Sequence, residues 1–187
     1  MRLKSIEKDL KIKNWAVHQK ILINLFHRGP DNKGYWISEN KTALLCNTRL
    51  AIIDLSKKAN QPIISKDNRY IIVFNGEIYN YIEIKKKLQK YNFKTNSDTE
   101  LILYAYIEYG EKCLNLFDGI FSFVIYDKLK SNLFCARDSF GVKPFYYYID
   151  KNLFFFSSEI KTFFLFNNIE KKINLRAVSS YLSSEYY

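Results

Sequence analysis

The sequence predicts a layered α+β fold, in which sheets and helices occupy separate layers. Apolar strand-like stretches come in blocks, and helical stretches separate these blocks without the regular strand-helix alternation of a parallel α/β sheet. The chain has 187 residues, of which 48% are hydrophobic and 17% aromatic. This length and composition fit one domain with a substantial core, with or without a tail, and they exclude a disordered chain.

The first helix is predicted over residues 5–26. Its apolar residues recur at helical spacing with lysines between them, at Ile6, Leu10, Val17, Ile21, Leu22 and Leu25. The helix should end at His27-Arg28-Gly29-Pro30-Asp31, because Gly29 and Pro30 do not continue a helix. This turn is either a C-terminal cap, with His27 and Arg28 complementing the helix dipole, or part of a site.

A lone arginine interrupts the next strand-rich region. A short strand is predicted over residues 34–37 and a longer strand-rich stretch over residues 43–54. Arg49 lies inside this apolar stretch and needs an anionic partner, because an unpaired buried charge is costly. The partner is either an internal carboxylate or the carboxylate of a ligand, which the planar guanidinium can bind through two hydrogen bonds.

The centre of the sequence is an apolar strand, residues 70–74, that runs into Asn75-Gly76-Glu77. One interpretation is a strand-to-helix turn, since Asn and Gly are common turn residues. The other is an oxyanion-binding corner, in which the Asn75 side chain and the Gly76 backbone each donate an N-H.

The second half alternates helices and strands again. Helices are predicted over residues 78–90 and 101–109, and either Ser97 or Asp98 caps the second of them, so Asp98 is either a cap or a ligand residue. The later elements are a hairpin over residues 119–127 and 133–138, strands over 145–149 and 153–156, a helix over 158–166, and a helix that begins at 173 and continues towards 187 without a turn signal.

Charge and cysteine content exclude several classes of function. The formal net charge is +10, but the lysines are scattered along the chain, so no nucleic-acid interface is predicted. Cys46, Cys113 and Cys135 lie far apart without a CxxC pair, which indicates no zinc site, no disulfide framework and a reducing, cytoplasmic setting. No signal peptide, membrane span or phosphate-binding loop is recognisable.

Eight short blocks, in the same order, resemble the glutamine amidotransferase domain of glutamine-hydrolysing asparagine synthetases. They are His27-Arg28-Gly29-Pro30-Asp31, Arg49-Leu50-Ala51-Ile52-Ile53-Asp54-Leu55, Gln61-Pro62, Phe74-Asn75-Gly76-Glu77-Ile78-Tyr79-Asn80, Ser97-Asp98-Thr99-Glu100, Arg137-Asp138, Gly141-Val142-Lys143-Pro144 and Ser158-Glu159-Ile160-Lys161. The resemblance covers residues from about 20 to the end. It implies a class II amidotransferase with the N-terminal-nucleophile hydrolase fold, a four-layer αββα sandwich of two antiparallel sheets between helices.

The resemblance also implies residue roles. In the family an N-terminal Cys attacks the side-chain amide of glutamine, and its own α-amine acts as the base. By similarity, Asn75 and the Gly76 N-H form the oxyanion hole, and Arg49 binds the glutamine α-carboxylate. Asp98 accepts from the α-ammonium, Glu77 lines the same pocket, and Arg28 lies near the nucleophile.

The sequence departs from the family pattern at several positions. It begins Met1-Arg2-Leu3-Lys4 where the family begins Met-Cys-Gly-Ile, so the nucleophile and the first strand are expected to be missing. Asn47 and Thr48 replace a His-Arg type pair, and Asn60 takes a position that is usually Gly. The expected division is an amidotransferase domain over residues 1–166 and, over residues 167–187, the start of a linker to an absent ATP-dependent synthetase domain.

Two functional hypotheses follow. In the first, the chain is the amidotransferase half of an asparagine synthase, which hydrolyses glutamine so that ammonia can amidate aspartate. In the second, it is an inactive domain that binds glutamine or docks on a synthetase. Either way glutamine and a synthetase domain or subunit are the expected partners, and a homodimer is an open alternative. No metal or cofactor is expected in this chain, because ATP and Mg belong to the synthetase domain.

Overall fold

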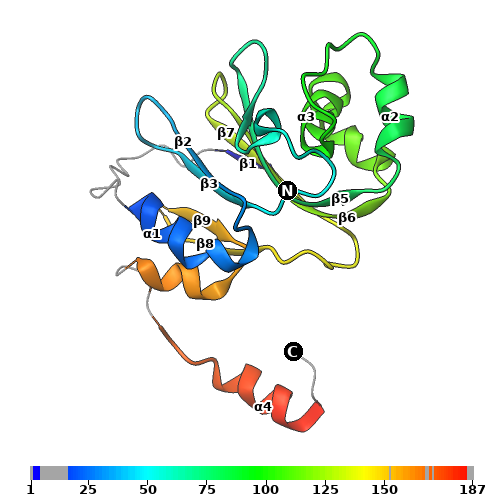
Figure 1. The fold of residues 1–187 in the computed structure, drawn as a ribbon. Helices are drawn as coiled ribbons and strands as arrows, with labels where there is room; N and C mark the ends of the chain where they lie inside the picture. The colour runs from blue at the N-terminus through cyan, green and yellow to red at the C-terminus, as the bar shows by residue number, and fades with distance from the viewer. Residues whose placement is uncertain (1, 5–16, 152, 167–168, 170, 185–187) are drawn as a thin grey trace.

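The computed structural model describes residues 2–4, 17–151, 153–166, 169 and 171–184 (Figure 1). Its strands are β1 (Arg2–Lys4), β2 (Asn32–Ile37), β3 (Leu44–Arg49), β4 (Ile63–Ile64), β5 (Tyr70–Ile78), β6 (Gly119–Asp127), β7 (Asn132–Arg137), β8 (Tyr146–Ile149) and β9 (Phe154–Ser157). Its α-helices are α1 (Val17–Asn24), α2 (Tyr81–Lys87), α3 (Asp98–Tyr109) and α4 (Leu175–Ser184). Short 3₁₀ helices are η1 (Phe26–Arg28), η2 (Lys57–Ala59), η3 (Gly110–Leu116) and η4 (Ile160–Leu165).

The main sheet has five antiparallel strands in the order β1-β7-β6-β5-β4. Its long central strands β5 and β6 pair along their whole length, from Tyr70 opposite Asp127 to Ile78 opposite Gly119. This pairing fixes which residues of β5 face each side of the sheet, because successive side chains along a strand point to opposite faces.

One face of the main sheet is covered by α2 and α3 (Figure 1). Ile72 and Phe74 of β5 belong to the core on this side, together with Ile102 and Ala105 of α3. Ile72, Ile102 and Ala105 are fully buried, as expected for a helix packed flat on a sheet. This core holds the first turn of α3, and therefore Asp98, beside the end of β5.

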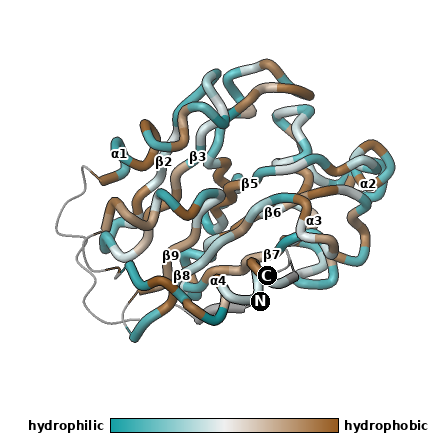
Figure 2. Tube along the Cα trace, turned by 90° about the horizontal axis from the view of Figure 1, so that it is seen from below, coloured by the Kyte–Doolittle hydropathy of each residue, from teal (hydrophilic) through white to brown (hydrophobic). Residues whose placement is uncertain are grey.

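The opposite face of the main sheet packs against the two-stranded sheets β2-β3 and β8-β9. Apolar stretches recur in the strands on both sides, among them β5 and β9 (Figure 2). The core between the sheets contains Leu45 of β3, Ile71 and Val73 of β5, and Val124 of β6. We call this space the intersheet layer.

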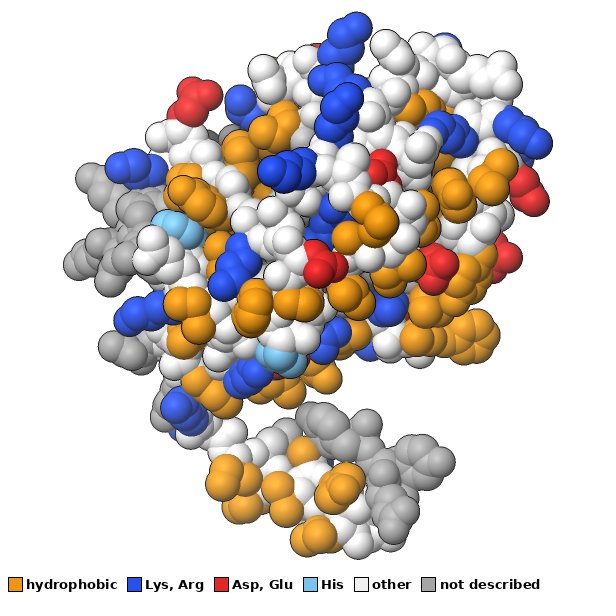
Figure 3. Space-filling model, viewed as in Figure 1, with side chains coloured by type: hydrophobic (Ala, Val, Ile, Leu, Met, Phe, Trp, Pro, Cys, Tyr) orange, Lys and Arg blue, Asp and Glu red, His pale blue; other side chains and the backbone are white. Residues whose placement is uncertain are grey.

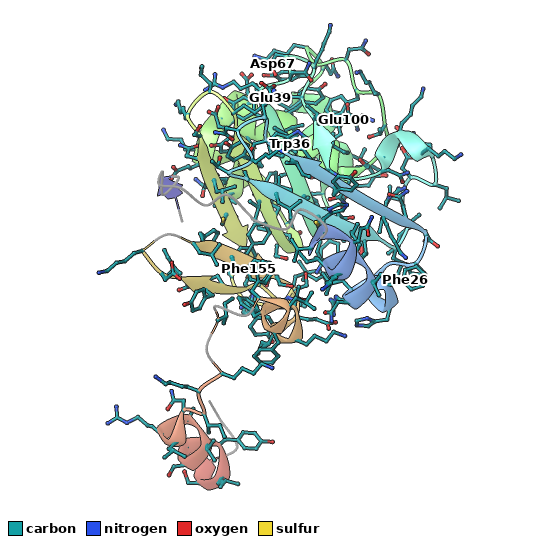
Figure 4. All side chains as sticks on the ribbon, turned by 90° about the vertical axis from the view of Figure 1, so that its left-hand side faces the viewer. Phe26, Trp36, Glu39, Asp67, Glu100 and Phe155 are labelled. Atoms are coloured by element: carbon teal, nitrogen blue, oxygen red, sulfur yellow. The ribbon has the colours of Figure 1, made fainter. Side chains whose placement is uncertain are left out.

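Helix α1 and the 3₁₀ helix η4 form the outer layer on this side. Val17, Ile21 and Leu22 are the buried residues of α1. Phe155 of β9 contacts Phe163 and Phe166, with ring centroids 4.7 and 4.6 Å apart, so its side chain joins β9 to η4 (Figure 4). The order helix, sheet, sheet, helix is the predicted four-layer αββα sandwich.

Three sequence predictions need correction. The first strand, which was predicted to be missing, is present, because Arg2–Lys4 pairs with β7. The first helix was predicted over residues 5–26; α1 covers Val17–Asn24 of it, and residues 5–16 lie outside the described residues. Strand β5 continues to Ile78 instead of ending at Phe74, since β6 supplies partners for these residues too. The segment predicted as a helix over residues 158–166 is the 3₁₀ helix η4.

The C-terminal helix α4 stands away from the four layers (Figure 3). Leu175, Tyr181 and Leu182 are 60% to 77% exposed, and their apolar side chains lie on the surface of the helix. Ile169, just beyond the predicted domain boundary, is only 8% exposed. None of the helices among the described residues has the length and apolar composition needed to cross a membrane.

Candidate glutamine site

Asn75 lies within the main sheet, so of the two interpretations of Asn75-Gly76 the strand-to-helix turn is excluded. It is paired with Ser122 of β6, which is paired in turn with Arg137 of β7. Since Val73 points into the intersheet layer, Asn75 two residues later points there too. Its Nδ2 atom is buried and has no hydrogen-bond partner among the described residues. A buried donor without a partner is rare in native structures, which makes Asn75 a candidate ligand group.

Gly76 allows the backbone of β5 to approach β6 closely. A Cβ atom at this position would overlap the carbonyl oxygen of Ile120 and the Cα atom of Phe121, so no larger residue fits without moving the strands. The Gly76 N-H points to the same edge of β5 as the N-H groups of Phe74 and Ile78, because alternate residues of a strand direct their N-H groups to one side. Those two N-H groups donate to side chains, at 2.6 Å to Gln61 Oε1 and 3.3 Å to Asp98 Oδ2. The Gly76 N-H therefore lies between them, at an edge where β4 no longer pairs with β5.

Arg49, the last residue of β3, is held by neutral acceptors. Its Nη1 atom donates to Asn60 Oδ1 at 2.9 Å and to the Ser56 carbonyl at 3.3 Å, and its Nη2 atom donates to the carbonyl of Asp54. None of the ion pairs among the described residues includes Arg49. Its charge is thus positioned by the loop 54–60 without a carboxylate in contact, which suits a ligand anion.

The His27–Asp31 turn fixes the backbone at Arg49. The Asp31 N-H donates to the Arg49 carbonyl at 3.0 Å, and Pro30 forms a parallel bridge with Arg49. A Cβ atom on Gly29 would overlap the backbone of Thr48, so the turn can approach β3 only with glycine there. The turn therefore contributes to the site by fixing the backbone position of Arg49.

Asp98 and Glu77 form an anionic corner at the end of β5. Ser97 is the N-cap of α3 and accepts from the Glu100 N-H, which leaves Asp98 inside the first turn. Burial raises the pKa of Asp98 to about 6, the N-H donors of Ile78 and Thr99 counteract part of this rise, and the charge of Glu77 adds to it. A buried carboxylate that feels the charge of a second, exposed carboxylate favours a bound cation.

Gln61 connects the two halves of this corner. Its side chain is buried, its Oε1 atom accepts from the Phe74 N-H, and its Nε2 atom donates to Thr99 Oγ1 at 3.2 Å. It therefore joins β5, one residue before Asn75, to the first turn of α3, one residue after Asp98. The sequence had drawn attention to Gln61 only as part of a motif, and its bridging role depends on contacts that only the fold creates.

Arg28 binds a carboxylate of the protein itself. Arg28 Nη1 lies 3.2 Å from Glu159 Oε1, where His27 Nε2 lies at 2.7 Å, and Lys161 Nζ lies 3.0 Å from Glu159 Oε2. Burial would raise the pKa of Glu159, but hydrogen bonds from Lys161, His27 and Arg28 lower it to about 2. This ion-pair cluster accounts for Arg28 without a ligand, so its role near a nucleophile stays a prediction.

The three cysteines are poor nucleophiles. Burial raises the pKa of Cys46, Cys113 and Cys135 to about 12 in each case, so their thiols stay protonated at neutral pH. The described residues also contain no group of three His, Cys, Asp or Glu side chains that could hold a metal ion. The charged side chains that the structure brings to this site include Arg49, Asp98 and Glu77.

Comparison with known proteins identifies the family of this chain. Residues 5–187 match the family model of the glutamine amidotransferase domain. Glutamine-hydrolysing asparagine synthetase 1 of Bacillus subtilis is 39% identical over 164 residues, which cover 87% of this chain and 25% of that protein. The glutamine-hydrolysing asparagine synthetase of Zea mays is 42% identical over 139 residues, which cover 73% of this chain and 23% of that protein. The chain thus spans about a quarter of the length of these relatives.

A solved structure shows the same fold. The chain superposes on glutamine phosphoribosylpyrophosphate amidotransferase from B. subtilis, a structure in complex with ADP and GMP, with a TM-score of 0.65. The match covers 78% of this chain and 39% of the other, at 20% sequence identity. The four layers are those of the N-terminal-nucleophile hydrolase fold, and the chain belongs to the family of glutamine amidotransferase domains found in glutamine-hydrolysing asparagine synthetases.

Proposed function

We propose that this chain binds L-glutamine where the ends of β3 and β5 meet the first turn of α3. The observation that carries the proposal is that this place holds charged side chains without an oppositely charged side chain in contact and a buried N-H donor without a hydrogen-bond partner. Arg49 offers a cation without a carboxylate in contact, Asp98 and Glu77 offer anions, and Asn75 Nδ2 is a buried donor without a partner. In the same order, these groups complement an α-carboxylate, an α-ammonium and an amide oxygen.

Titration calorimetry on the full chain tests this proposal. L-glutamine should bind, and 4-carbamoylbutanoate, which lacks the α-amine, should bind at least ten times more weakly, because the buried Asp98 carboxylate would be left without a cation in contact. D-glutamine should also bind weakly, since it cannot match both charged groups and Asn75 together. Absence of heat with L-glutamine at millimolar concentration contradicts the proposal.

Hydrolysis requires a nucleophile beside Asn75 and Gly76. We infer the position of such a residue from the pairing of β1, in which Arg2 is opposite Phe134 and β1 runs antiparallel to β7. Across the sheet, Asn75 is opposite Ser122, which is opposite Arg137 of β7. Arg137 lies three residues beyond Phe134, on the side towards which the N-terminal end of β1 points. A chain that follows β7 for this distance would bring an N-terminal Cys to the row of Asn75.

We propose that the ammonia released from glutamine amidates aspartate on an ATP-dependent synthetase domain or subunit in the cytoplasm. The length and names of the relatives support this role. The α4 segment would then begin the connection to that domain.

The alternative is a domain that binds glutamine without turnover. Burial keeps the thiols of Cys46, Cys113 and Cys135 protonated, which supports this alternative. N-terminal sequencing of the native protein and an assay of glutamate release distinguish the two. An N-terminal Cys with glutamate release supports the hydrolase, whereas glutamine binding without glutamate release supports the binding domain.

A further inference from the structure

A second buried polar atom without a hydrogen-bond partner lies on β3, in a side chain that contacts the strand of Asn75. Among the described residues, the buried side-chain atoms that lack any hydrogen bond are Asn75 Nδ2 and Asn47 Oδ1. Asn47 lies on β3, two residues after Leu45 and two before Arg49. Because Leu45 belongs to the intersheet core, all three residues point into the intersheet layer.

One hydrogen bond determines the orientation of the Asn47 amide. Its Nδ2 atom donates to the carbonyl oxygen of Phe74 at 3.4 Å, so the side chain reaches the residue directly before Asn75. The opposite orientation would place two acceptors against each other. The open atom of Asn47 is therefore an acceptor, whereas the open atom of Asn75 is a donor.

The acceptor of Asn47 and the donor of Asn75, both without a hydrogen-bond partner, together match a primary amide, which has two N-H donors on its nitrogen and an acceptor oxygen. We propose that Asn47 is a specificity-determining residue, whose Oδ1 atom accepts a hydrogen bond from the amide NH₂ group of bound glutamine while Asn75 Nδ2 donates to the amide oxygen. This inference rests on the proposed glutamine site. It assigns a function to a position at which the sequence departs from the family pattern.

The placement of Arg49 fits the same ligand. Alternate residues on one face of a strand are roughly 6.5 Å apart, which is of the same order as the separation of the α-carboxylate and the amide in an extended glutamine. One strand, β3, thus contributes groups for both ends of the molecule. Glutamate would place an anionic oxygen against Asn47 Oδ1, so Asn47 disfavours the acid and the site selects the amide.

The test compares L-glutamine with L-glutamate by titration calorimetry on the full chain. The variants are Asn47→Leu, which has a similar size without polar atoms, and Asn47→Ala, which introduces no steric strain. The unmodified protein should prefer glutamine, and each variant should reduce the glutamine-to-glutamate affinity ratio about tenfold, because one hydrogen bond and one repulsion are removed.

Asn80→Leu is the matched control. Asn80 Nδ2 also donates to a backbone carbonyl, that of Leu116, at 2.9 Å, but its Oδ1 atom already accepts from the Asp118 N-H at 3.1 Å. Its replacement should lower thermal stability and leave the affinity ratio unchanged.

The outcomes separate the two proposals. Absence of glutamine binding to the unmodified protein overturns both. An unmodified protein that binds glutamine and glutamate equally, or a folded Asn47 variant with an unchanged ratio, overturns the role of Asn47 and leaves the glutamine site standing. Cooperative thermal unfolding of each variant shows that it is folded, and Asn47→Ala decides the matter where Asn47→Leu does not fold.

Discussion

The protonation of Asp98 should control ligand binding at the scale of a single residue. Its pKa is raised to about 6, mainly by burial, so the carboxyl group is ionised at pH 7 and mostly neutral at pH 5. A neutral Asp98 loses its attraction for an α-ammonium group. Glutamine affinity should therefore fall about tenfold from pH 7 to pH 5, as measured by calorimetry.

Asp98→Asn provides the control for this dependence. The variant should bind glutamine weakly at both pH values, since its side chain carries no charge. Without ligand it should be at least as stable as the parent at pH 7. A carboxyl whose pKa is higher in the folded state than in the unfolded state lowers stability as pH rises from about 4 to 6. A parent affinity that does not change between pH 5 and pH 7 would contradict the role of Asp98.

Arg49 should be irreplaceable by another cation. Arg49→Lys keeps the charge but loses the planar fork that reaches Asn60 and the carbonyl groups of the 54–60 loop. We expect glutamine affinity to fall by ten- to a hundredfold, about 1.4 to 2.7 kcal/mol, because one ammonium cannot bind the loop and a ligand carboxylate together.

Arg69→Lys tests whether such a loss is general. Arg69 binds both carboxylate oxygens of Asp127, at 3.0 and 2.8 Å, far along the strands from Asn75. This variant should lose stability and keep its glutamine affinity. Equal loss of affinity in both variants would show that Arg49 acts only through the fold.

At the scale of elements, the ion pairs of Glu159 with His27, Arg28 and Lys161 connect η1 to the start of η4. The pKa of Glu159 is lowered to about 2, so the stabilisation from its ion pairs is present above about pH 4.5 and is lost as pH falls towards 2. After allowance for solvent screening, Glu159→Gln should lower the free energy of unfolding by about 1–2 kcal/mol at pH 7. Urea unfolding at pH 7 and pH 3 measures both values, and the difference between variant and parent should shrink at pH 3.

Glu39→Gln is the matched surface control. Glu39 is 93% exposed, and its carboxylate lies 3.6 Å from Lys128 Nζ. Exposed pairs of this kind contribute little, so the variant should stay within about 0.5 kcal/mol of the parent at both pH values. A Glu159 variant that behaves like this control would show that the cluster does not hold η1 and η4 together.

At the scale of the whole molecule, the four layers should fold without α4. The helix packs few of its side chains, and Leu175, Tyr181 and Leu182 remain exposed. Deletion of residues 171–187 should leave the melting temperature within a few degrees of the parent, because little apolar surface leaves the core. A deletion that also removes Ile169, which is 8% exposed, should cost more. Differential scanning calorimetry of both truncated chains measures this, and a large loss from the first deletion would show that α4 belongs to the domain.

The sequence alone determined the layered α+β class, most strand positions and the motif residues, because these depend on local apolar patterns and residue type. It left two interpretations for Asn75 and Gly76, a turn or an oxyanion-binding corner, and the structure excludes the turn because β6 extends the strand through both residues. Pairing with a distant strand outweighs the local turn preference of Asn and Gly.

Only the tertiary structure determined which buried polar groups lack a hydrogen-bond partner within the protein. The sequence placed Arg49 beside Asn47 and Asp98 beside Ser97, but it could not show that Gln61 joins β5 to α3, that Arg28 is bound to Glu159, or that Asn47 reaches Phe74. Hydrogen bonds between residues far apart in the chain are fixed by packing, and packing determines which buried atoms remain for a ligand. The residue types of the site could thus be read from the sequence, whereas the match of its open groups to glutamine required the fold.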